Sequence, residues 1–294
     1  MLILTGIVLK RAGFLTKESS RVMTRLALDI SLPCSIVRSF LIEMDEEKLR
    51  VFGTVLLIGT AVMLVQVGAS FIAFNMIPRE HRDPMRYGLI NANNAFLGYP
   101  MVEGIFGTEG IAIASIYMIP VRISIWSVGL GIFTAQGAKG KAIVKNCLLH
   151  PAMIAMYIGL FFMVTQLTPP AFLNDGMRML ANCLTPLSML TIGTILAEVP
   201  VRKLLDPQIL WFCLVRLVLI PALILLVCRL LSAPALTTGV CVLMSAMPAA
   251  SLTAMLSLQY GRDSAFATLI VTLSTLLSVL TVPVWMMIVS SLVG

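Results

Sequence analysis

The sequence has little charge. Only 12% of its 294 residues are Asp, Glu, Lys or Arg, whereas 59% are hydrophobic, and its mean hydropathy is +0.97. Soluble domains carry about 25% charged residues, so a water-soluble globule could not hide this much apolar surface. Transmembrane β-barrels alternate apolar and polar residues, whereas the apolar runs here are long and unbroken. The composition therefore predicts an all-α polytopic membrane protein.

Histidine and cysteine are also too sparse for a metal or redox centre. The chain has 2 His and 6 Cys, and the cysteines stand singly, without a CxxC pair or a nearby histidine cluster. We interpret them as small packing residues and expect no metal and no other cofactor. The motifs HExxH, GxSG and GxGD are missing as well, which argues against an intramembrane enzyme.

Ten apolar segments divide the chain. A membrane-spanning helix needs about 20 apolar residues, but residues 1–9 supply less than half of that before Lys10 and Arg11. We expect them to be the inner end of an incomplete first helix, and not a signal peptide, because the basic residues follow the apolar run. The nine full segments are 26–42, 51–77, 87–106, 111–134, 148–166, 177–196, 209–231, 236–258 and 265–288.

Lysine and arginine are unevenly distributed between alternate loops. Loops after odd-numbered segments hold 14 of the 21, and the other loops hold four. Basic loops face the cytoplasm, so both termini are predicted to be extracytoplasmic in a multi-pass inner or plasma membrane protein. The net charge of +7 thus signals topology, and we expect a lipid bilayer, not nucleic acid, as the partner. The first basic loop is predicted to contain Lys10, Arg11, Lys17, Arg21 and Arg25.

The two halves of the chain resemble each other. Residues 27–35 align with residues 180–188 at an offset of 153, and residues 107–109 align with 261–263 at an offset of 154. Five segments per half is an odd number, so two homologous halves must lie inverted in the membrane. We predict one transmembrane domain over residues 1–294, with inverted repeats at 1–136 and 143–294 and a ten-helix (5+5) architecture.

The fourth and ninth segments are interrupted near their middles. Asparagine brings donors and acceptors that hydrocarbon cannot satisfy, and glycine and proline weaken a helix. Non-helical backbone at membrane depth is tolerated only against protein or around a wet cavity, and paired breaks point to a transporter's binding site. We expect the breaks to cross there and their new helix N-termini to attract an anion. The predicted site residues are Asn91, Asn93, Asn94, Gly98, Pro100 and Pro248.

Arg122 lies near the centre of the fifth segment. An arginine there costs at least about 2.5–3.5 kcal/mol on insertion scales, so it needs a carboxylate partner or an anionic substrate. We predict that it binds a substrate carboxylate; the alternative is a structural ion pair, with Asp29 or Glu103 as partner. Either acid is also a candidate protonatable coupling group.

Other polar residues within the segments are weaker candidates for the substrate site. Arg38 and Arg216 lie off-centre, so we expect snorkelling or helix packing. Among the hydroxyls near the second break, Ser251 is predicted to reach the site, whereas Ser245 and Thr253 are interpreted as packing residues. The asparagines of the first break have an alternative role as hydrogen-bonding contacts between helices.

At these residues the sequence resembles the bacterial branch of the auxin efflux carrier family, over nearly the whole chain. The resemblance implies a ten-helix transporter with a fold like that of bile-acid symporters and sodium/proton antiporters. Segments one, two, six and seven would form a scaffold, and the other six a moving bundle. Plant members export auxin, and bacterial members are associated with malonate, malate and similar carboxylates. The motifs that carry the resemblance are residues 93–100, 106–110, 246–251, 259–261 and 273–278, together with Pro283.

The sequence thus predicts a secondary active transporter of a small organic anion, a dicarboxylate or auxin-like carboxylate. It would work by alternating access, with H⁺ or Na⁺ as the candidate coupling ion and with a homodimer as one arrangement. The alternative is a passive channel or a membrane receptor for an organic acid. The family pattern is not complete, because Ala92 stands where some members carry the first crossover proline.

Overall fold

A computed structural model describes residues 2–41, 46–133, 149, 151–197 and 206–293. Within these residues the regular structure is helical, apart from one isolated antiparallel bridge between Ala92 and Ala249. The predicted basic loops around Lys139–Lys145 and Arg202–Lys203 lie outside the described residues. Four of the described helices are long and apolar enough to cross a membrane: Leu49–Ala73, Asn94–Phe133, Pro207–Leu230 and Ser264–Leu292.

Large apolar side chains lie on the outer faces of these helices. Ile72 is 82% exposed, Leu230 76% and Leu280 69%. Large exposed apolar side chains on long apolar helices are unfavourable in water and are expected where a helix contacts lipid. The prediction of an all-α membrane protein is therefore confirmed.

The chain divides into two compact units. Unit 1 comprises residues 1–50, 95–115 and 148–199, and unit 2 comprises residues 51–94, 116–147 and 200–294. Each unit combines segments from both halves of the sequence. The division follows the scaffold and bundle that the family resemblance implies, except that residues 95–115 belong to unit 1.

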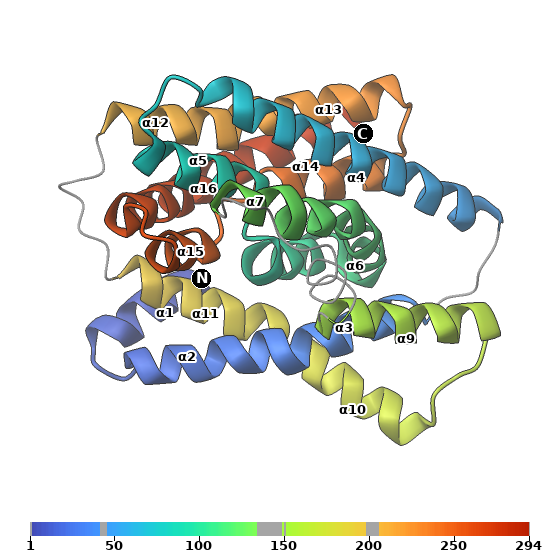
Figure 1. Cartoon of the computed structure of the whole chain (residues 1–294). Helices are drawn as coiled ribbons and strands as arrows, with labels where there is room; N and C mark the ends of the chain where they lie inside the picture. Colours follow the sequence, from blue (N-terminus) through green and yellow to red (C-terminus); the bar gives the residue numbers. More distant parts are fainter. Residues whose placement is uncertain (1, 42–45, 134–148, 150, 198–205, 294) are drawn as a thin grey trace. The chain divides into compact units, whose positions relative to one another are not determined.

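Unit 1 is built around two helix pairs. The helix α1 packs on α11, and α3 packs on α9 (Figure 1). Small residues allow the close approach of α3 and α9, because a Cβ added to Gly159 would come within 2.8 Å of the Phe40 ring. The helices of this unit are α1 (Leu2–Arg11), α2 (Lys17–Arg25), η1 (Leu26–Ser31), α3 (Leu32–Ser39), α9 (Pro151–Thr165), α10 (Ala171–Asn182) and α11 (Leu184–Leu196).

The first basic loop is shorter than predicted. Lys17, Arg21 and Arg25 lie on α2, which runs on without interruption through η1 into α3. Thr16 starts this helix early, because its Oγ1 accepts a hydrogen bond from the N–H of Ser19 at 3.1 Å. An N-cap of this type satisfies a backbone donor that would otherwise be left free.

Unit 2 is organised around α16, which packs against α5, α12, α14 and α15. Trp285 on α16 donates from Nε1 to the carbonyl oxygen of Leu217 at 2.8 Å, which fixes α16 to η5. The segments η2 (Asn94–Gly98) and α6 (Tyr99–Ser124) contribute to both units. The other helices are α4 (Glu46–Ala73), α5 (Arg79–Ile90), η3 (Ile125–Gly129), α7 (Leu130–Phe133), α12 (Pro207–Leu214), η5 (Val215–Leu219), α13 (Ile220–Leu230), α14 (Ala235–Ser245), α15 (Leu252–Gln259) and α16 (Ser264–Val293).

Candidate functional site

Two interrupted helices meet in unit 2. The helix α5 ends at Ile90 and α14 ends at Ser245, and the chain after each is non-helical. The N–H of Asn93 donates to the carbonyl oxygen of Pro248 at 2.8 Å, and the N–H of Ala250 donates to that of Asn91 at 3.0 Å. These two bonds form the short antiparallel bridge, which we call the crossing (residues 91–94 and 247–250). Both predicted interruptions are confirmed, and they pair with each other.

Arg216 joins the ends of the two interrupted helices. From η5 its Nε donates to the carbonyl oxygen of Met247 at 2.8 Å, and its Nη1 donates to that of Leu89 at 3.0 Å. The side chain is completely buried. Of the two roles expected for Arg216, snorkelling is wrong, whereas a packing role between helices fits these contacts. The broken helices leave carbonyl oxygens without intrahelical partners, and the buried guanidinium supplies the donors.

A serine on α16 completes the hydrogen bonding of the crossing. Ser274 accepts at Oγ from the N–H of Ala249 at 3.2 Å. Together with Arg216 it accounts for backbone groups that neither helix can satisfy. The sequence alone gives no sign of this contact, because the partner of Ser274 lies in a different segment.

The three asparagines of the first break have different environments. Asn91 is buried and donates from Nδ2 to the Tyr87 hydroxyl at 3.1 Å. Asn93 is half-buried, and its backbone holds Pro248. Asn94 is 1% exposed and donates to the sulfur of Met118 at 3.3 Å, while its Oδ1 has no hydrogen-bond partner within the described chain. Asn94 therefore keeps unused hydrogen-bonding capacity at the crossing.

The two hydroxyls that follow the second break differ in burial. Ser251 is exposed, whereas Thr253, in the first turn of α15, is fully buried. The Thr253 Oγ1 makes no hydrogen bond to any residue that the structure describes. The two positions lie on different faces of the turn, since two residues correspond to about 200° around a helix.

Arg122 lies on α6, 5% exposed. It follows Met118 by one helical turn, so the two side chains share a helix face. Met118 is the residue that contacts Asn94. Arg122 and Asn94 both belong to unit 2, and Arg122 lies one helical turn after the residue that contacts Asn94.

The remaining predicted residues belong to unit 1. Gly98 and Pro100 are buried at the junction of η2 and α6. Asp29 is exposed on η1. Glu103 on α6 accepts at Oε1 from the Ser35 hydroxyl at 2.7 Å and at Oε2 from the Thr185 hydroxyl at 3.0 Å. Glu103 is therefore held by hydroxyls from α3 and α11.

Metal ligands do not gather in the described residues. Among them, no group of three or more His, Cys, Asp or Glu side chains is placed to hold a metal ion. Cys213, Cys228 and Cys241 are buried, whereas Cys183, in the turn between α10 and α11, is exposed.

An all-helical chain with long apolar helices and two paired interruptions is typical of multi-pass membrane transporters. Residues 1–286 match the membrane transport protein family, and the chain belongs to this family, that of the auxin efflux carriers. It is similar to an uncharacterized transporter of Methanothermobacter thermautotrophicus, with 28% identity over 290 residues, 97% of this chain and 94% of the relative. It is also similar to an uncharacterized transporter of Methanocaldococcus jannaschii, with 24% identity over 299 residues and the same coverage. The resemblance to the family is confirmed.

Proposed function

We propose that the chain is a secondary active transporter of a small organic anion, which binds at the crossing and is moved by alternating access. The observation that carries this proposal is the third nitrogen of Arg216. While Nε and Nη1 hold the two carbonyl oxygens, Nη2 is buried without a hydrogen-bond partner among the described residues. Leaving such a donor unpaired costs about 1–3 kcal/mol or more. A substrate carboxylate would satisfy it, and dicarboxylates and auxin-like carboxylates carry that group.

The helix ends at the crossing also favour an anion. The helices α5 and α14 end there, and their C-termini carry partial negative charge. Arg216 neutralises these ends, since it bonds to carbonyl oxygens at both of them. The N-termini of η2 at Asn94 and of α15 at Leu252 remain, and they carry partial positive charge. Both N-termini directly follow the crossing in sequence, so we expect them to favour an anion there.

Three further polar groups complete the proposed binding set. Asn94 Oδ1, Thr253 Oγ1 and the Tyr117 hydroxyl are buried without described hydrogen-bond partners. Tyr117 lies within electrostatic range of Arg216, and it precedes Met118, the contact of Asn94. Hydroxyls donate to carboxylate oxygens, while Asn94 Oδ1 accepts from a substrate hydroxyl or protonated carboxyl. Arg122 is the second basic group that we assign to the substrate.

The predicted inverted repeat is supported by the packing of unit 1. The helix α1 of the first half packs on α11 of the second, and α9 of the second packs on α3 of the first. Gly6 and Gly159 stand 153 residues apart. At each of them an added Cβ would come within 3.0 Å of the partner helix. Such an exchange of partners is expected of two homologous halves related by a pseudo-two-fold axis.

Backbone conformation also supports the offset of about 154 residues between equivalent positions of the two halves. Gly107 and Gly261 stand 154 residues apart and adopt φ values of +65° and +63°. L-residues with a side chain rarely adopt this conformation. We infer ten helices in two inverted halves, with the termini on the extracytoplasmic side, as the distribution of basic loops predicts.

Glu103 is our first candidate for coupling to an ion. Its carboxylate is held by hydroxyls of two other helices of unit 1, so protonation would change contacts among α3, α6 and α11. Asp29 is the second candidate, although it is exposed. The proposal leaves H⁺ and Na⁺ as the two ions to be tested.

Uptake by proteoliposomes tests the proposed function. We expect saturable uptake of labelled malonate or malate that is accelerated by an inward H⁺ or Na⁺ gradient. A channel would instead show ohmic, non-saturating conductance, and a receptor would bind the acid without flux. Absence of carboxylate flux with folded, reconstituted protein contradicts the proposal.

A further inference from the structure

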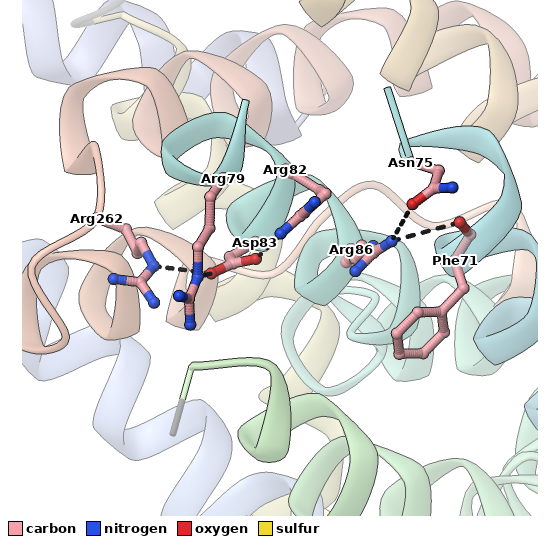
Figure 2. Close-up of polar contacts among 7 residues, drawn as sticks. All are labelled: Phe71, Asn75, Arg79, Arg82, Asp83, Arg86 and Arg262. Atoms are coloured by element: carbon pink, nitrogen blue, oxygen red, sulfur yellow. Dashed lines mark hydrogen bonds and ion pairs between the residues drawn. The ribbon is translucent and has the colours of Figure 1, made fainter. Parts of the chain in front are cut away.

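Arginines of unit 2 gather around a single carboxylate (Figure 2). Asp83 on α5 is 3% exposed. Its Oδ2 accepts from Arg262 Nε at 2.8 Å and from Arg79 Nε at 3.4 Å, and its Oδ1 lies 3.8 Å from Arg82 Nε. Asp83 cannot neutralise three guanidinium groups. The cluster therefore carries an excess of positive charge.

Arg86 adds to this excess. Its Nη2 makes long contacts of 3.4 Å to the Phe71 carbonyl oxygen and 3.5 Å to Asn75 Oδ1, and its guanidinium lies 4.5 Å from the centre of the Phe71 ring. Partial burial and repulsion by Arg82 lower the pKa of Arg86, against the opposing effect of Asp83. The Nε atoms of Arg82 and Arg86 are buried without hydrogen-bond partners among the described residues. Asp83 Oδ1 is too far from Arg82 Nε for a hydrogen bond, so each of these two arginines keeps a donor that is not hydrogen-bonded within the described chain.

These arginines line a surface cavity of about 400 Å³. Arg79, Arg82, Arg86 and Asp83 form its polar wall, and Phe71 and Val128 are part of its apolar wall. The membrane-spanning part of α4 ends at Ala73, so the cavity opens where this helix leaves the hydrocarbon.

Exposed apolar side chains follow Phe71, a lining residue of the cavity. Ile72, near the end of α4, is 82% exposed, and Met76, in the turn after α4, is 99% exposed. A soluble anion makes no use of such side chains, whereas a lipid places its acyl chains along them. The loop after this segment is also among the basic loops that the sequence assigns to the cytoplasm, where anionic lipids attract arginine.

We propose that this cavity binds the phosphate headgroup of an anionic membrane phospholipid, with the acyl chains along Ile72 and Val128. Guanidinium groups bind phosphate oxygens through paired N–H donors. The Nε atoms of Arg82 and Arg86 would gain acceptors, and the phosphate would balance the charge that Asp83 leaves. The site is separate from the crossing and does not depend on the transported substrate.

Native mass spectrometry of the detergent-solubilised full chain tests this site. Phosphatidylglycerol, phosphatidylcholine and inorganic phosphate serve as probes. We expect phosphatidylglycerol to bind more tightly than phosphatidylcholine, and the Arg82→Gln/Arg86→Gln variant to lose roughly fivefold in affinity for each arginine removed. The exposed Arg79→Gln change provides a milder variant, with a loss of about fivefold, should the double variant fail to fold.

Arg178→Gln is the matched control. Arg178 pairs with Asp175 at 2.9 Å on the exposed face of α10 in unit 1, so its removal should leave phosphatidylglycerol binding unchanged. Equal binding of phosphatidylglycerol by the wild type, Arg79→Gln and the double variant would overturn the proposal. If millimolar inorganic phosphate displaced phosphatidylglycerol from the protein, the proposal would also be overturned, in favour of a site for a soluble anion.

Discussion

Arg216 donates from Nε to the carbonyl oxygen of Met247 at 2.8 Å, from a position with no exposed surface. A break in a membrane helix leaves carbonyl oxygens that lipid cannot satisfy. Arg216 supplies donors to both broken helices, because Nη1 also holds the carbonyl oxygen of Leu89. One side chain therefore stabilises the crossing and offers its remaining nitrogen to a ligand.

Replacing Arg216 with methionine is expected to destabilise the protein by about 3 kcal/mol or more, because each hydrogen bond from a charged donor contributes roughly 1.5–3 kcal/mol. Lysine keeps the charge but lacks the fixed fork of donors, so the stability of Arg216→Lys should lie between those of the wild type and the methionine variant. Thermal unfolding in detergent checks this order. A methionine variant as stable as the wild type would show that the two carbonyl oxygens find other donors.

Thr253→Val separates substrate binding from stability. Its Oγ1 has no described partner, so the change should leave the melting temperature within a few degrees while raising the KM of carboxylate uptake about fivefold or more. Thr237→Val is the matched control: Thr237 is equally buried, with an equally unpaired hydroxyl among the described residues, but lies about 12 Å along α14 from Ser245. Equal effects of the two changes on KM would remove Thr253 from the site.

Asn94→Asp tests the sign of the substrate charge. The change is nearly isosteric, but it places a carboxylate where we expect an anion. We predict a more than tenfold loss of carboxylate affinity at neutral pH, which corresponds to about 1.4 kcal/mol. The loss should shrink as the pH falls, because protonation of the introduced carboxylate removes the repulsion, and a buried carboxyl group is protonated more readily than an exposed one.

Uptake measured against pH for Asn94→Asp, Asn94→Ala and the wild type checks this prediction. Only the aspartate variant should regain affinity on acidification relative to the wild type. Tighter substrate binding in Asn94→Asp than in the wild type would mean that the protein carries a cation.

The helix interruptions could be predicted because their cause is local. Asn91, Asn94 and Pro248 stand inside apolar runs, and their chemistry is incompatible with a continuous helix in lipid. The apolar runs 51–77, 209–231 and 265–288 likewise coincide with described helices that are long enough to cross a membrane. The start of α2 was missed, although Thr16 ahead of a polar stretch is a recognisable N-cap.

The role of Arg216 could not be predicted in this way, since its partners are distant in sequence. Leu89 is 127 residues away and Met247 is 31 residues away. The available signal was energetic: an arginine inside an apolar run must be paired, whether or not it lies at the centre. The burial of Thr253 and the exposure of Ser251 could not be predicted, because spacing from Pro248 does not show which side of a new helix turn is buried.

The two glycines with positive φ test the inverted repeat through stability. Gly107→Ala and Gly261→Ala should each destabilise the protein by about 1–2 kcal/mol, because a Cβ is strained at φ near +65°. An added Cβ meets no atom within 4 Å at either position, so the effect comes from the backbone alone.

Gly104→Ala is the control for these two changes. Gly104 lies one turn before Gly107 on α6, in open space and without positive φ, so alanine there should stabilise the protein by up to about 1 kcal/mol. Thermal unfolding of the three variants distinguishes the cases. If the two halves share a positive-φ glycine at equivalent positions, Gly107→Ala and Gly261→Ala will lower stability by similar amounts. If one change stabilised the protein and the other destabilised it, the two turns would be unrelated.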